Sequence, residues 1–499
     1  MLYVKFDTDL FRYDIEDIIK LFFEEEKIEP VDHEPPSLNG GIFLNSSLIE
    51  EEKGLFLCVE IKAIEETRHE LSFPIASIAN ENVSYPEQKN IKKEIKRKVY
   101  SILSALTGKE LPWGILTGIR PAKIVHDMLC EGKKKEEIIK KLNEYYMVSN
   151  KKSELLYKTA EAEKEILNNT EQDSVSIYIG IPFCKTRCIY CSFTSYSVDK
   201  YSHMLNAYLE SLKREIRYVS DFIKTKNIKI QSIYIGGGTP TSLDLHLLYD
   251  LVDCLEKSFN FDYIEEFTLE AGRPDTIDRD KLKLVKESKV DRISINPQSM
   301  NDTTLKLIGR NHTSADIINA FNLAREVGIV NINMDVIAGL PGESLSMFKK
   351  TMDGISLLCP ESLTVHTMAV KRASRLKEEG KSDSLRPDVV EGMIDLAQSC
   401  ASEMEMHPYY LYRQKNILGN LENIGYCKPR HESIYNIQIM EERQTIIAMG
   451  AGAITKVVFG LENRIERAFN VKSVEDYISR TDEMIDRKRT LLEQLYKQQ

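Results

Sequence analysis

The sequence predicts an α/β protein built on a partial barrel of six βα units, with an α+β domain before the barrel and a mainly helical cap after it. Short runs of β-branched residues alternate with amphipathic helical patterns between residues 175 and 370, and the regions on either side lack this alternation. Glycines, prolines and polar residues gather directly after the strand-like runs. With 499 residues, the chain is long enough for two or three compact units.

The N-terminal region, residues 1–165, is expected to form an α+β domain that ends in a helical connector. The strand-like runs lie at 42–44 and 55–61, and the charged helices at 91–107, 135–146 and 153–167. No motif in this region points to a particular chemistry, so its function is left unassigned.

The barrel domain is expected at residues 170–380. Its six strands are predicted at 175–181, 232–235, 266–270, 291–296, 331–338 and 363–370. The helices between them are predicted at 204–222, 243–259, 280–287, 315–327 and 346–358. Because the loops after barrel strands converge on one face, we expect the active site there.

The last region, residues 385–499, is expected to form a cap over the mouth of the barrel. Its pattern is mainly helical, with a tyrosine-rich stretch at Tyr409–Arg413 and a glycine-rich loop at Gly450–Ala453.

Charge and hydropathy exclude some classes of partner. The formal charge is −10, and the run Lys133–Lys135 is followed at once by two glutamates, so we expect no nucleic-acid partner. The most apolar stretch, Thr445–Leu461, contains Lys456 and glycines, so we expect no membrane segment. The N-terminus lacks the pattern of a signal peptide, and we predict a cytoplasmic protein.

Three of the nine cysteines lie within eight residues, just after the first predicted barrel strand. Cys184, Cys188 and Cys191 have the spacing C-x3-C-x2-C, which suits three thiolates around one inorganic cluster. Three ligands leave one iron with an open coordination position, which is a catalytic feature. The alternative is a zinc site with His203 as the fourth ligand.

With Tyr190 before the last cysteine, this motif resembles the signature of the radical S-adenosylmethionine (SAM) superfamily. The resemblance implies a [4Fe-4S] cluster on the three cysteines, with SAM bound at its open iron and cleaved to a 5'-deoxyadenosyl radical. The glycine tract of Gly236, Gly237 and Gly238, followed by Thr239 and Pro240, resembles the superfamily's site for the SAM amino group.

From about Tyr178 to Ile454 the chain resembles the oxygen-independent coproporphyrinogen III oxidase family. The resemblance implies that Tyr178 contacts the cluster-bound SAM, that Glu270 binds its ribose and that Ile454 is an apolar contact. The resemblance also implies a second SAM. Gln298, Arg310 and Asp335, which keep the family's spacing of 12 and then 25 positions, would contact it. The other contacts would be Tyr190, Gly238, Thr239 and Ala369. Taken singly, an acid such as Glu270 or Asp335 is more often a helix cap or an ion-pair partner.

The implied reaction is oxidative decarboxylation of two propionates of coproporphyrinogen III to vinyl groups, giving protoporphyrinogen IX for haem biosynthesis. The implied partners are a tetrapyrrole substrate and an electron donor such as flavodoxin or ferredoxin. Cations are expected near the substrate carboxylates, and the candidates are Lys371, Arg372, Arg413 and Lys415. Basic residues near loops are more often simply solvated.

The sequence departs from the best-characterised members of the family. Phe193 stands where they carry a further cysteine, Gly180 stands where they carry a histidine, and the N-terminal region is an addition. These features resemble the longer coproporphyrinogen dehydrogenase branch, the HemZ-type. Two alternatives stay open: a haem-binding chaperone of the same family, and a radical SAM methyltransferase. A haem-binding protein would need an axial ligand, for which the candidates are His312, His366, His407 and His431.

Overall fold

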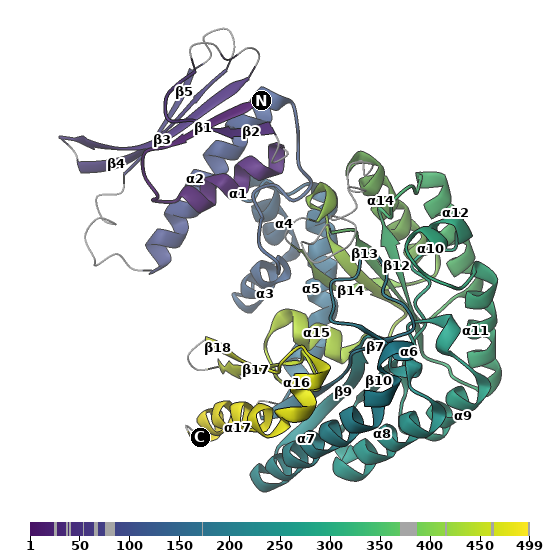
Figure 1. The fold of residues 1–499 in the computed structure, drawn as a ribbon. Helices are drawn as coiled ribbons and strands as arrows, with labels where there is room; N and C mark the ends of the chain where they lie inside the picture. Colours follow the sequence, from purple (N-terminus) through teal and green to yellow (C-terminus); the bar gives the residue numbers. More distant parts are fainter. Residues whose placement is uncertain are drawn as a thin grey trace. The chain divides into compact units, whose positions relative to one another are not determined.

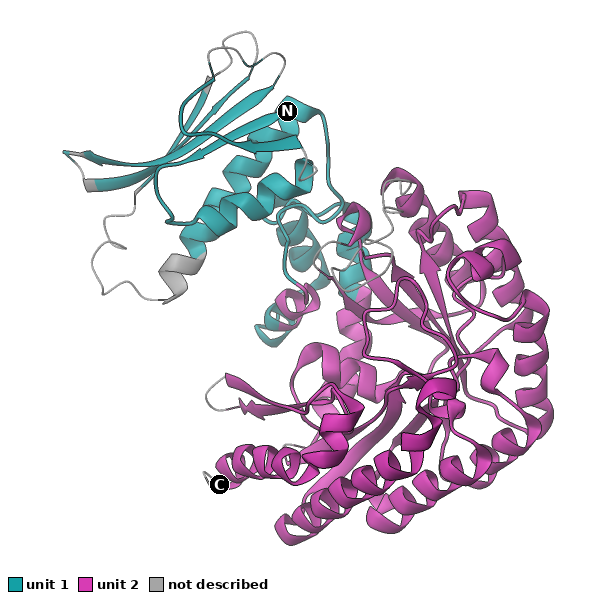
Figure 2. Cartoon of the chain, in the orientation of Figure 1, with its two compact units in different colours: residues 1–118, 127–157 teal, residues 119–126, 158–499 magenta. Residues whose placement is uncertain are grey.

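The computed structural model divides the chain into two compact units, shown in Figure 2. One comprises Met1–Gly118 and Asp127–Tyr157, and the other Ile119–His126 and Lys158–Gln499. The structure describes residues 1–23, 27–35, 38, 41–52, 54–63, 68–74, 85–171, 173–369, 387–414, 417–460 and 464–497. The division puts the expected barrel and the expected cap into one unit, while the predicted boundaries at 165 and 380 stay predictions.

The first unit contains a five-stranded sheet with the order β2-β1-β3-β4-β5. The strands are β1 (Leu2–Phe6), β2 (Ile28–Pro30), β3 (Ile42–Glu51), β4 (Gly54–Lys62) and β5 (Arg68–Pro74), and the helices are α1 (Arg12–Phe22), α2 (Tyr85–Thr107) and α4 (Lys135–Glu144). Helix α1 buries Ile15, Ile18, Ile19 and Phe22, which recur every three to four residues on one face. Helices α3 (Ala122–Cys130) and α5 (Asn150–Asn169) each contribute residues to both units.

The second unit contains the predicted series of βα units. Its parallel strands follow the chain order: β6 (Ser174–Ile181), β9 (Lys229–Gly237), β10 (Glu266–Glu270), β11 (Arg292–Ser294), β12 (Ile332–Ala338) and β13 (Ser362–Thr367). Between them lie α7 (Leu205–Lys226), α8 (Leu245–Ser258), α9 (Arg279–Glu287), α11 (Ser314–Val327) and α12 (Leu345–Leu358). In Figure 1 these helices cover the outer face of the curved sheet, so the predicted α/β fold class is confirmed.

The C-terminal region adds five strands to this sheet, which the pattern analysis did not predict. β16 (Thr445–Met449) pairs in parallel with β6 and continues into the hairpin of β17 (Ile454–Phe459) and β18 (Arg464–Phe469). At the other edge, β15 (Asn423–Cys427) and β14 (His407–Tyr412) pair antiparallel beyond β13. The helices of this region are α14 (Pro387–Glu403), α15 (Ile434–Glu441), α16 (Val474–Ser479) and α17 (Thr481–Lys497). The sheet order ends at β14 and β18, which matches a partial barrel.

None of the helices in the described ranges is long and apolar enough to cross a membrane.

A buried polar network fastens the C-terminal helices to the start of the barrel. Glu215 on α7 accepts hydrogen bonds from Lys488 Nζ at 2.5 Å and from the hydroxyl of Tyr477 at 2.6 Å. The backbone N–H of Gly450 donates to the same carboxylate at 2.9 Å. The Tyr208 hydroxyl donates to the carbonyl of Gly180 at 2.6 Å, on the strand that leads to the three cysteines. The side chains of Glu215 and Lys488 are fully buried, so each charge depends on the other.

We predict that removing one charge of this pair costs more stability than removing both. Glu215→Gln leaves the Lys488 ammonium buried without a carboxylate, and we expect the free energy of unfolding to fall by about 3 to 5 kcal/mol. The double variant Glu215→Gln/Lys488→Met should recover much of that loss. Urea denaturation of the four proteins of this double-mutant cycle measures the coupling. Strictly additive losses would contradict the prediction.

Candidate active site

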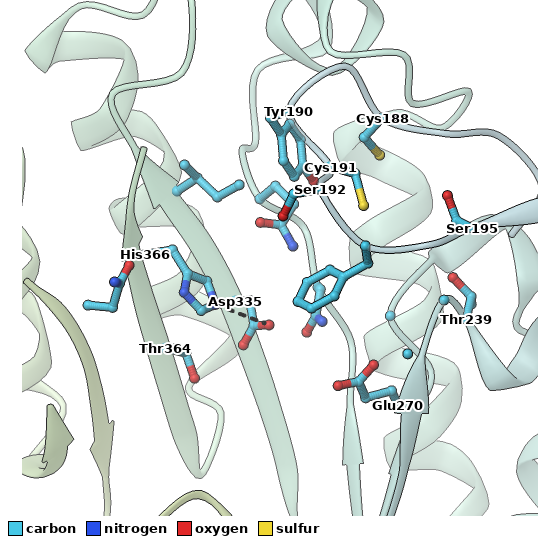
Figure 3. Close-up of a pocket in the computed structure, with 18 of the residues that line it drawn as sticks. Cys188, Tyr190, Cys191, Ser192, Ser195, Thr239, Glu270, Asp335, Thr364 and His366 are labelled. Atoms are coloured by element: carbon cyan, nitrogen blue, oxygen red, sulfur yellow. Dashed lines mark ion pairs between the residues drawn. The ribbon is translucent and has the colours of Figure 1, made fainter. Parts of the chain in front are cut away.

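A cavity of about 450 Å³ opens beyond the carboxyl ends of the parallel strands, and the three clustered cysteines line it. In Figure 3, Cys188, Tyr190 and Cys191 lie on the loop above the cavity, Thr239 and Glu270 lie on one side, and Asp335, Thr364 and His366 on the other. The volume lies in the range of small-molecule sites. This is the face of the barrel on which an active site was expected.

The loop that carries the cysteines is held in place by its backbone and by Thr186. It begins at β7 (Phe183–Cys184), which pairs with β8 (Tyr196–Ser197). The N–H of Ile189 donates to the carbonyl of Ile308 at 3.1 Å, and the Thr186 hydroxyl donates to the carbonyl of Gly309 at 2.9 Å. The loop is therefore fixed to the segment that follows α10 (Asp302–Leu307).

The buried side chain of Arg273 also holds the cysteine loop in place. Arg273 Nη1 donates to the carbonyl and to the hydroxyl of Thr186, at 3.1 and 2.8 Å. Its Nε and Nη2 donate to the two carboxylate oxygens of Asp275, at 2.9 and 3.0 Å. Burial acts to raise the pKa of Asp275, but His312 and Arg273 outweigh it and hold that pKa below its usual value. This bidentate pair gives the loop a rigid support.

The three thiols fit a cluster better than a single zinc ion. In the described part of the chain they do not form a group whose ligand atoms all lie within 4.8 Å of one another, although one tetrahedral ion requires such closeness. His203 is exposed, stacks on Tyr201 and does not line the cavity. Burial raises the pKa of the Cys184 thiol to about 11, so it needs a bound cation to become a thiolate. The donor set therefore suits a multi-iron cluster, which the three thiolates would hold.

The glycine tract forms a cradle in which there is no space for side chains. A Cβ on Gly238 would lie 2.5 Å from the carbonyl oxygen of Phe183, and Gly237 has a φ of 108°. The N–H of Gly238 donates to the carbonyl of Ile181 at 2.7 Å, and that of Thr239 donates to the carbonyl of Phe183 at 2.8 Å. The end of β9 is thus pressed against the strand that leads to the cysteines. Thr239 Oγ1 lies 3.5 Å from Cys184 Sγ.

Three tyrosine rings and one acid form the floor of the cavity. Tyr178 stacks against Tyr234 and Tyr435, with centroids at 6.3 and 6.0 Å, and Tyr234 stacks on Tyr435 at 4.4 Å. The Tyr234 hydroxyl donates to Glu270 Oε1 at 2.6 Å. Burial, aided by the charge of Asp335, raises the pKa of Glu270 to about 7. The acid is therefore poised for a cationic or hydroxylated ligand.

Three of the residues predicted for a second SAM, Gln298, Arg310 and Asp335, line another wall of the cavity. Gln298 is almost buried and has a φ of 65°, an unusual conformation for a residue with a side chain, and its N–H donates to the carbonyl of Asp335 at 2.9 Å. Arg310 donates to the carbonyl of Asn296 at 2.5 Å and to the Tyr190 hydroxyl at 3.4 Å. Its Nε is buried and has no hydrogen-bond partner. A buried guanidinium with an unused donor at a cavity wall fits an anionic group.

The cavity brings together nearly every residue predicted for the site. The lining residues include Tyr178, Cys184, Cys188, Tyr190, Cys191, Gly237, Gly238, Thr239, Glu270, Gln298, Arg310, Asp335 and Ala369. Ile454 does not line it. This residue begins β17, is 40% exposed and pairs with Phe469, because the hairpin turns outward from β16.

Most of the predicted cations cannot be placed at the site. Lys371, Arg372 and Lys415 lie outside the described residues. Arg413 is buried but turns away from the cavity to Asn420, whose carbonyl accepts from Nη2 at 2.8 Å. Of the four histidines considered as axial ligands, His366 lines the cavity, 3.7 Å from Asp335.

The surroundings of Phe193 and Gly180, the two departures from the family pattern, are also visible in the structure. Phe193 is 66% exposed at the rim of the cavity. A Cβ on Gly180 would already lie 3.3 Å from the carbonyl oxygen of Met449, so the strand pairing with β16 leaves little space for a larger side chain.

The sequence analysis missed several residues that line this cavity, and four of them show which signals were available. Tyr234 on β9 is the register partner of Tyr178 on β6. Because both tyrosines lie shortly before the ends of their strands, the position of Tyr178 could have pointed to Tyr234. Arg273 follows the predicted Glu270-Ala271-Gly272 segment and could have been found in the same way. Tyr435 and Asn436 come from α15, and no local pattern points to them.

Comparisons with known proteins agree with this geometry. The family model for the radical SAM superfamily matches residues 178–355. The chain is 42% identical over 412 residues to the oxygen-independent coproporphyrinogen-III oxidase-like protein HemZ of Bacillus subtilis, which covers 82% of each chain. It is 32% identical to the heme chaperone HemW of Bacillus subtilis, over 56% of this chain and 70% of the relative.

Among solved structures, coproporphyrinogen III oxidase (HemN) from Escherichia coli matches with a TM-score of 0.51 and 22% identity. The match covers 65% of this chain and 73% of that one, and the likeness concerns the fold.

We predict that Gly238→Ala damages the cradle. The new methyl group would meet the carbonyls of Phe183 and Ile181, and overpacking of this kind costs about 1 to 3 kcal/mol. We expect the melting temperature to fall and the iron bound after anaerobic reconstitution to drop several-fold. The matched control is Gly460→Ala, because a Cβ there meets nothing within 4 Å. Equal iron retention in the two variants would contradict the role of the cradle.

Proposed function

Because this chain belongs to the radical SAM superfamily, and within it to the oxygen-independent coproporphyrinogen III oxidase family, we propose that it oxidatively decarboxylates coproporphyrinogen III. Each of two propionates would lose a hydrogen atom to the 5'-deoxyadenosyl radical, then carbon dioxide and one electron, which a one-electron acceptor would take up, to become a vinyl group, giving protoporphyrinogen IX. The observation that carries the proposal is that a single cavity holds the three cysteines together with Gln298, Arg310 and Asp335. A cysteine-bound cluster alone would not need the second set.

Cys184, Cys188 and Cys191 would hold a [4Fe-4S] cluster with one iron left open to SAM. When bound, the cluster and SAM supply the carbon-centred radical that this class of reaction needs. The electron for this chemistry would come from a small redox protein such as flavodoxin or ferredoxin. We propose that the protein works in the cytoplasm.

The residues around the cluster would orient SAM and keep water out. The backbone of Gly237 and Gly238 lines the cavity and could contact the methionyl group. Glu270, held by Tyr234, can accept hydrogen bonds from the two hydroxyls of a ribose. The tyrosine stack of Tyr178, Tyr234 and Tyr435 closes the floor of the cavity.

A second SAM would lie against the wall formed by Gln298, Arg310 and Asp335. The unused Nε of Arg310 can bind a carboxylate, and Asp335 can accept from a hydroxyl or an ammonium. Two propionates are decarboxylated per substrate, so two radical-generating cofactors match the stoichiometry of the proposed reaction.

A second candidate function is haem binding and transfer. Two observations favour it: the similarity to the heme chaperone HemW, and His366, whose ring lines the cavity. An imidazole at a cavity wall is a common haem ligand. In that case His366 would bind iron, and tetrapyrrole decarboxylation would not occur.

An anaerobic assay separates the two functions. With reconstituted cluster, dithionite, SAM and coproporphyrinogen III, we expect vinyl-bearing porphyrins and about one 5'-deoxyadenosine per decarboxylation, measured by chromatography. Cys188→Ala should abolish both products. Cys254→Ala, at a half-buried thiol on α8, should leave them unchanged.

Slow SAM cleavage without a vinyl product would overturn the oxidase proposal. If haem then bound tightly, and His366→Ala weakened it, the haem-transfer function would take its place.

We also predict that SAM affinity falls as the pH is lowered through 7. The pKa of Glu270 is raised to about 7, so its carboxyl group is protonated below that pH and cannot accept from both ribose hydroxyls. The dissociation constant of SAM should rise by up to about tenfold per pH unit below 7. Glu270→Gln should bind more weakly at pH 8 and lose most of this pH dependence. Equilibrium dialysis with labelled SAM measures both, and an identical pH profile in the two proteins would contradict the role of Glu270.

A further inference from the structure

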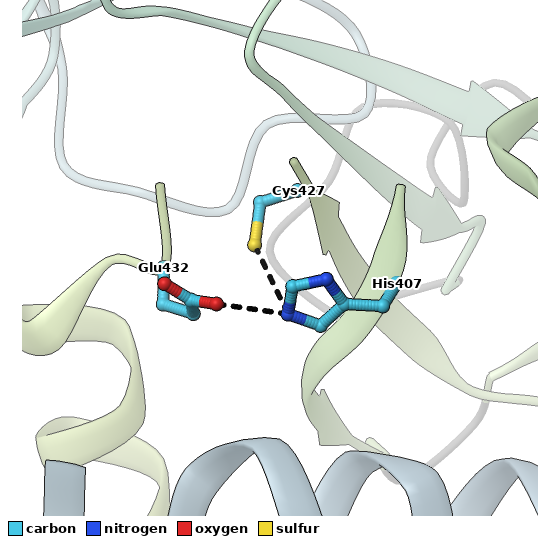
Figure 4. Close-up of side chains that lie close together, drawn as sticks. All are labelled: His407, Cys427 and Glu432. Carbon is cyan, nitrogen blue, oxygen red and sulfur yellow. Dashed lines mark hydrogen bonds and ion pairs between the residues drawn. The ribbon is translucent and has the colours of Figure 1, made fainter. Parts of the chain in front are cut away.

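Three side chains of metal-binding type converge at the end of the barrel opposite the cavity. Figure 4 shows His407 from β14, Cys427 from β15 and Glu432 from the loop before α15 pointing toward one another. His407 and Cys427 are direct partners in the antiparallel ladder, and Cys427 also pairs with Ser362, the first residue of β13. Side chains at this end of a barrel serve stability rather than catalysis.

The distances between the ligand atoms are close to those that one tetrahedral ion requires. His407 Nε2 lies 2.8 Å from Glu432 Oε1 and 3.8 Å from Cys427 Sγ, and the three ligand atoms all lie within 4.8 Å of one another. Zinc bonds of about 2.0 Å to nitrogen or oxygen and 2.3 Å to sulfur place neighbouring ligands about 3.3 to 3.5 Å apart. The two distances from His407 Nε2 therefore differ from these values by about half an ångström or less.

The charges around the cluster also suit a divalent cation. Without a metal the Cys427 thiol keeps its proton, because burial and the neighbouring Glu432 raise its pKa. One divalent ion would displace that proton and be held by the thiolate, the carboxylate and a neutral imidazole. A neighbouring cationic side chain, Arg292, is held by other groups: it donates to the carbonyls of His431 and Glu432 and to the hydroxyl of Ser362. Its hydrogen bonds to this loop go to backbone carbonyls, whereas the Glu432 carboxylate faces His407, another member of the cluster.

We propose that His407, Cys427 and Glu432 bind one zinc ion, with a water molecule as the fourth ligand. Cys427 is fully buried, whereas the His407 and Glu432 side chains are 35% and 19% exposed, so the ion can enter from the solvent side. A nitrogen, sulfur and oxygen set of this kind favours zinc over magnesium or calcium.

Such an ion would fasten the pocket floor to the sheet edge. Glu432 lies directly before α15, whose Tyr435 stacks on Tyr234, and His407 begins β14, whose Tyr410 and Tyr412 line the cavity. The zinc would act as a structural link and would not depend on the proposed enzymatic activity.

A second cluster in the same unit provides a comparison. His126, Glu163 and Glu441 also have ligand atoms within 4.8 Å, but their side chains are only 4%, 0% and 1% exposed. Burial raises the pKa of Glu163 and brings that of Glu441 to about 7, so protons satisfy much of this cluster. It offers no thiolate and no open rim, and we expect no zinc there.

The test uses the full chain, in which the three clustered cysteines are replaced so that they do not compete for zinc. In the Cys184→Ser/Cys188→Ser/Cys191→Ser background, the metal-free protein is titrated with Zn²⁺ against a chromophoric chelator, and with Co²⁺ as a spectroscopic probe. We expect one zinc per chain, a rise in melting temperature, and a near-ultraviolet thiolate-to-cobalt band.

The ligand variants Cys427→Ser and Glu432→Gln should lower zinc affinity at least tenfold, and Cys427→Ser should abolish the cobalt band. Glu432→Gln alters a partly exposed side chain, so it tests the site even if Cys427→Ser folds poorly. The matched controls are Cys400→Ser, at another buried thiol, and Glu441→Gln in the comparison cluster; both should bind zinc normally. Absence of zinc binding at micromolar concentration, or a cobalt band unchanged in Cys427→Ser, would overturn the proposal.

Discussion

The close backbone contact between the ends of β6 and β9 is the constraint on which the site depends. Gly238 and Thr239 donate to the carbonyls of Ile181 and Phe183, and a single methyl group on Gly238 would collide with them. This contact places the cysteine loop and the glycine cradle next to each other at the same strand ends. Without it, the thiols and the SAM-binding backbone would belong to separate loops with no fixed geometry.

The C-terminal strands and helices stabilise the first strand of the barrel, on which this contact depends. β16 pairs with β6 along five residues, and the buried Glu215 and Lys488 pair holds α17 and the glycine-rich loop behind it. Tyr208 then connects this network to Gly180, one residue from the strand end. β16, α17 and the glycine-rich loop therefore support the strand that leads to the cysteine loop, whereas residues of β14 and α15 line the cavity itself.

The local patterns predicted the strand series and most of the site because they depend on short-range rules. Glu266–Glu270 was predicted with its observed bounds, and Glu270 and Gln298 lie at or near predicted strand ends. Asp335 lies in the middle of β12 and was placed only by the spacing of the family it resembles. Tyr435 and the strands β14 to β18 were missed, because their roles arise from pairing with segments far away in the sequence. Ile454 was placed at the site by resemblance, but the outward turn of β17 carries it away from the cavity.

The charges in the cavity favour a cationic ligand whichever activity the protein has. Glu270 and Asp335 face the same space, and their mutual repulsion helps to raise the pKa of Glu270 to about 7. A sulfonium or an ammonium group entering between them would relieve that repulsion and return the carboxyl group to its ionised form. A bare tetrapyrrole carboxylate would instead be repelled from these acids, so it would have to enter on the Arg310 side or after SAM has bound. In the proposed reaction, these two acids would favour binding of SAM before the anionic substrate.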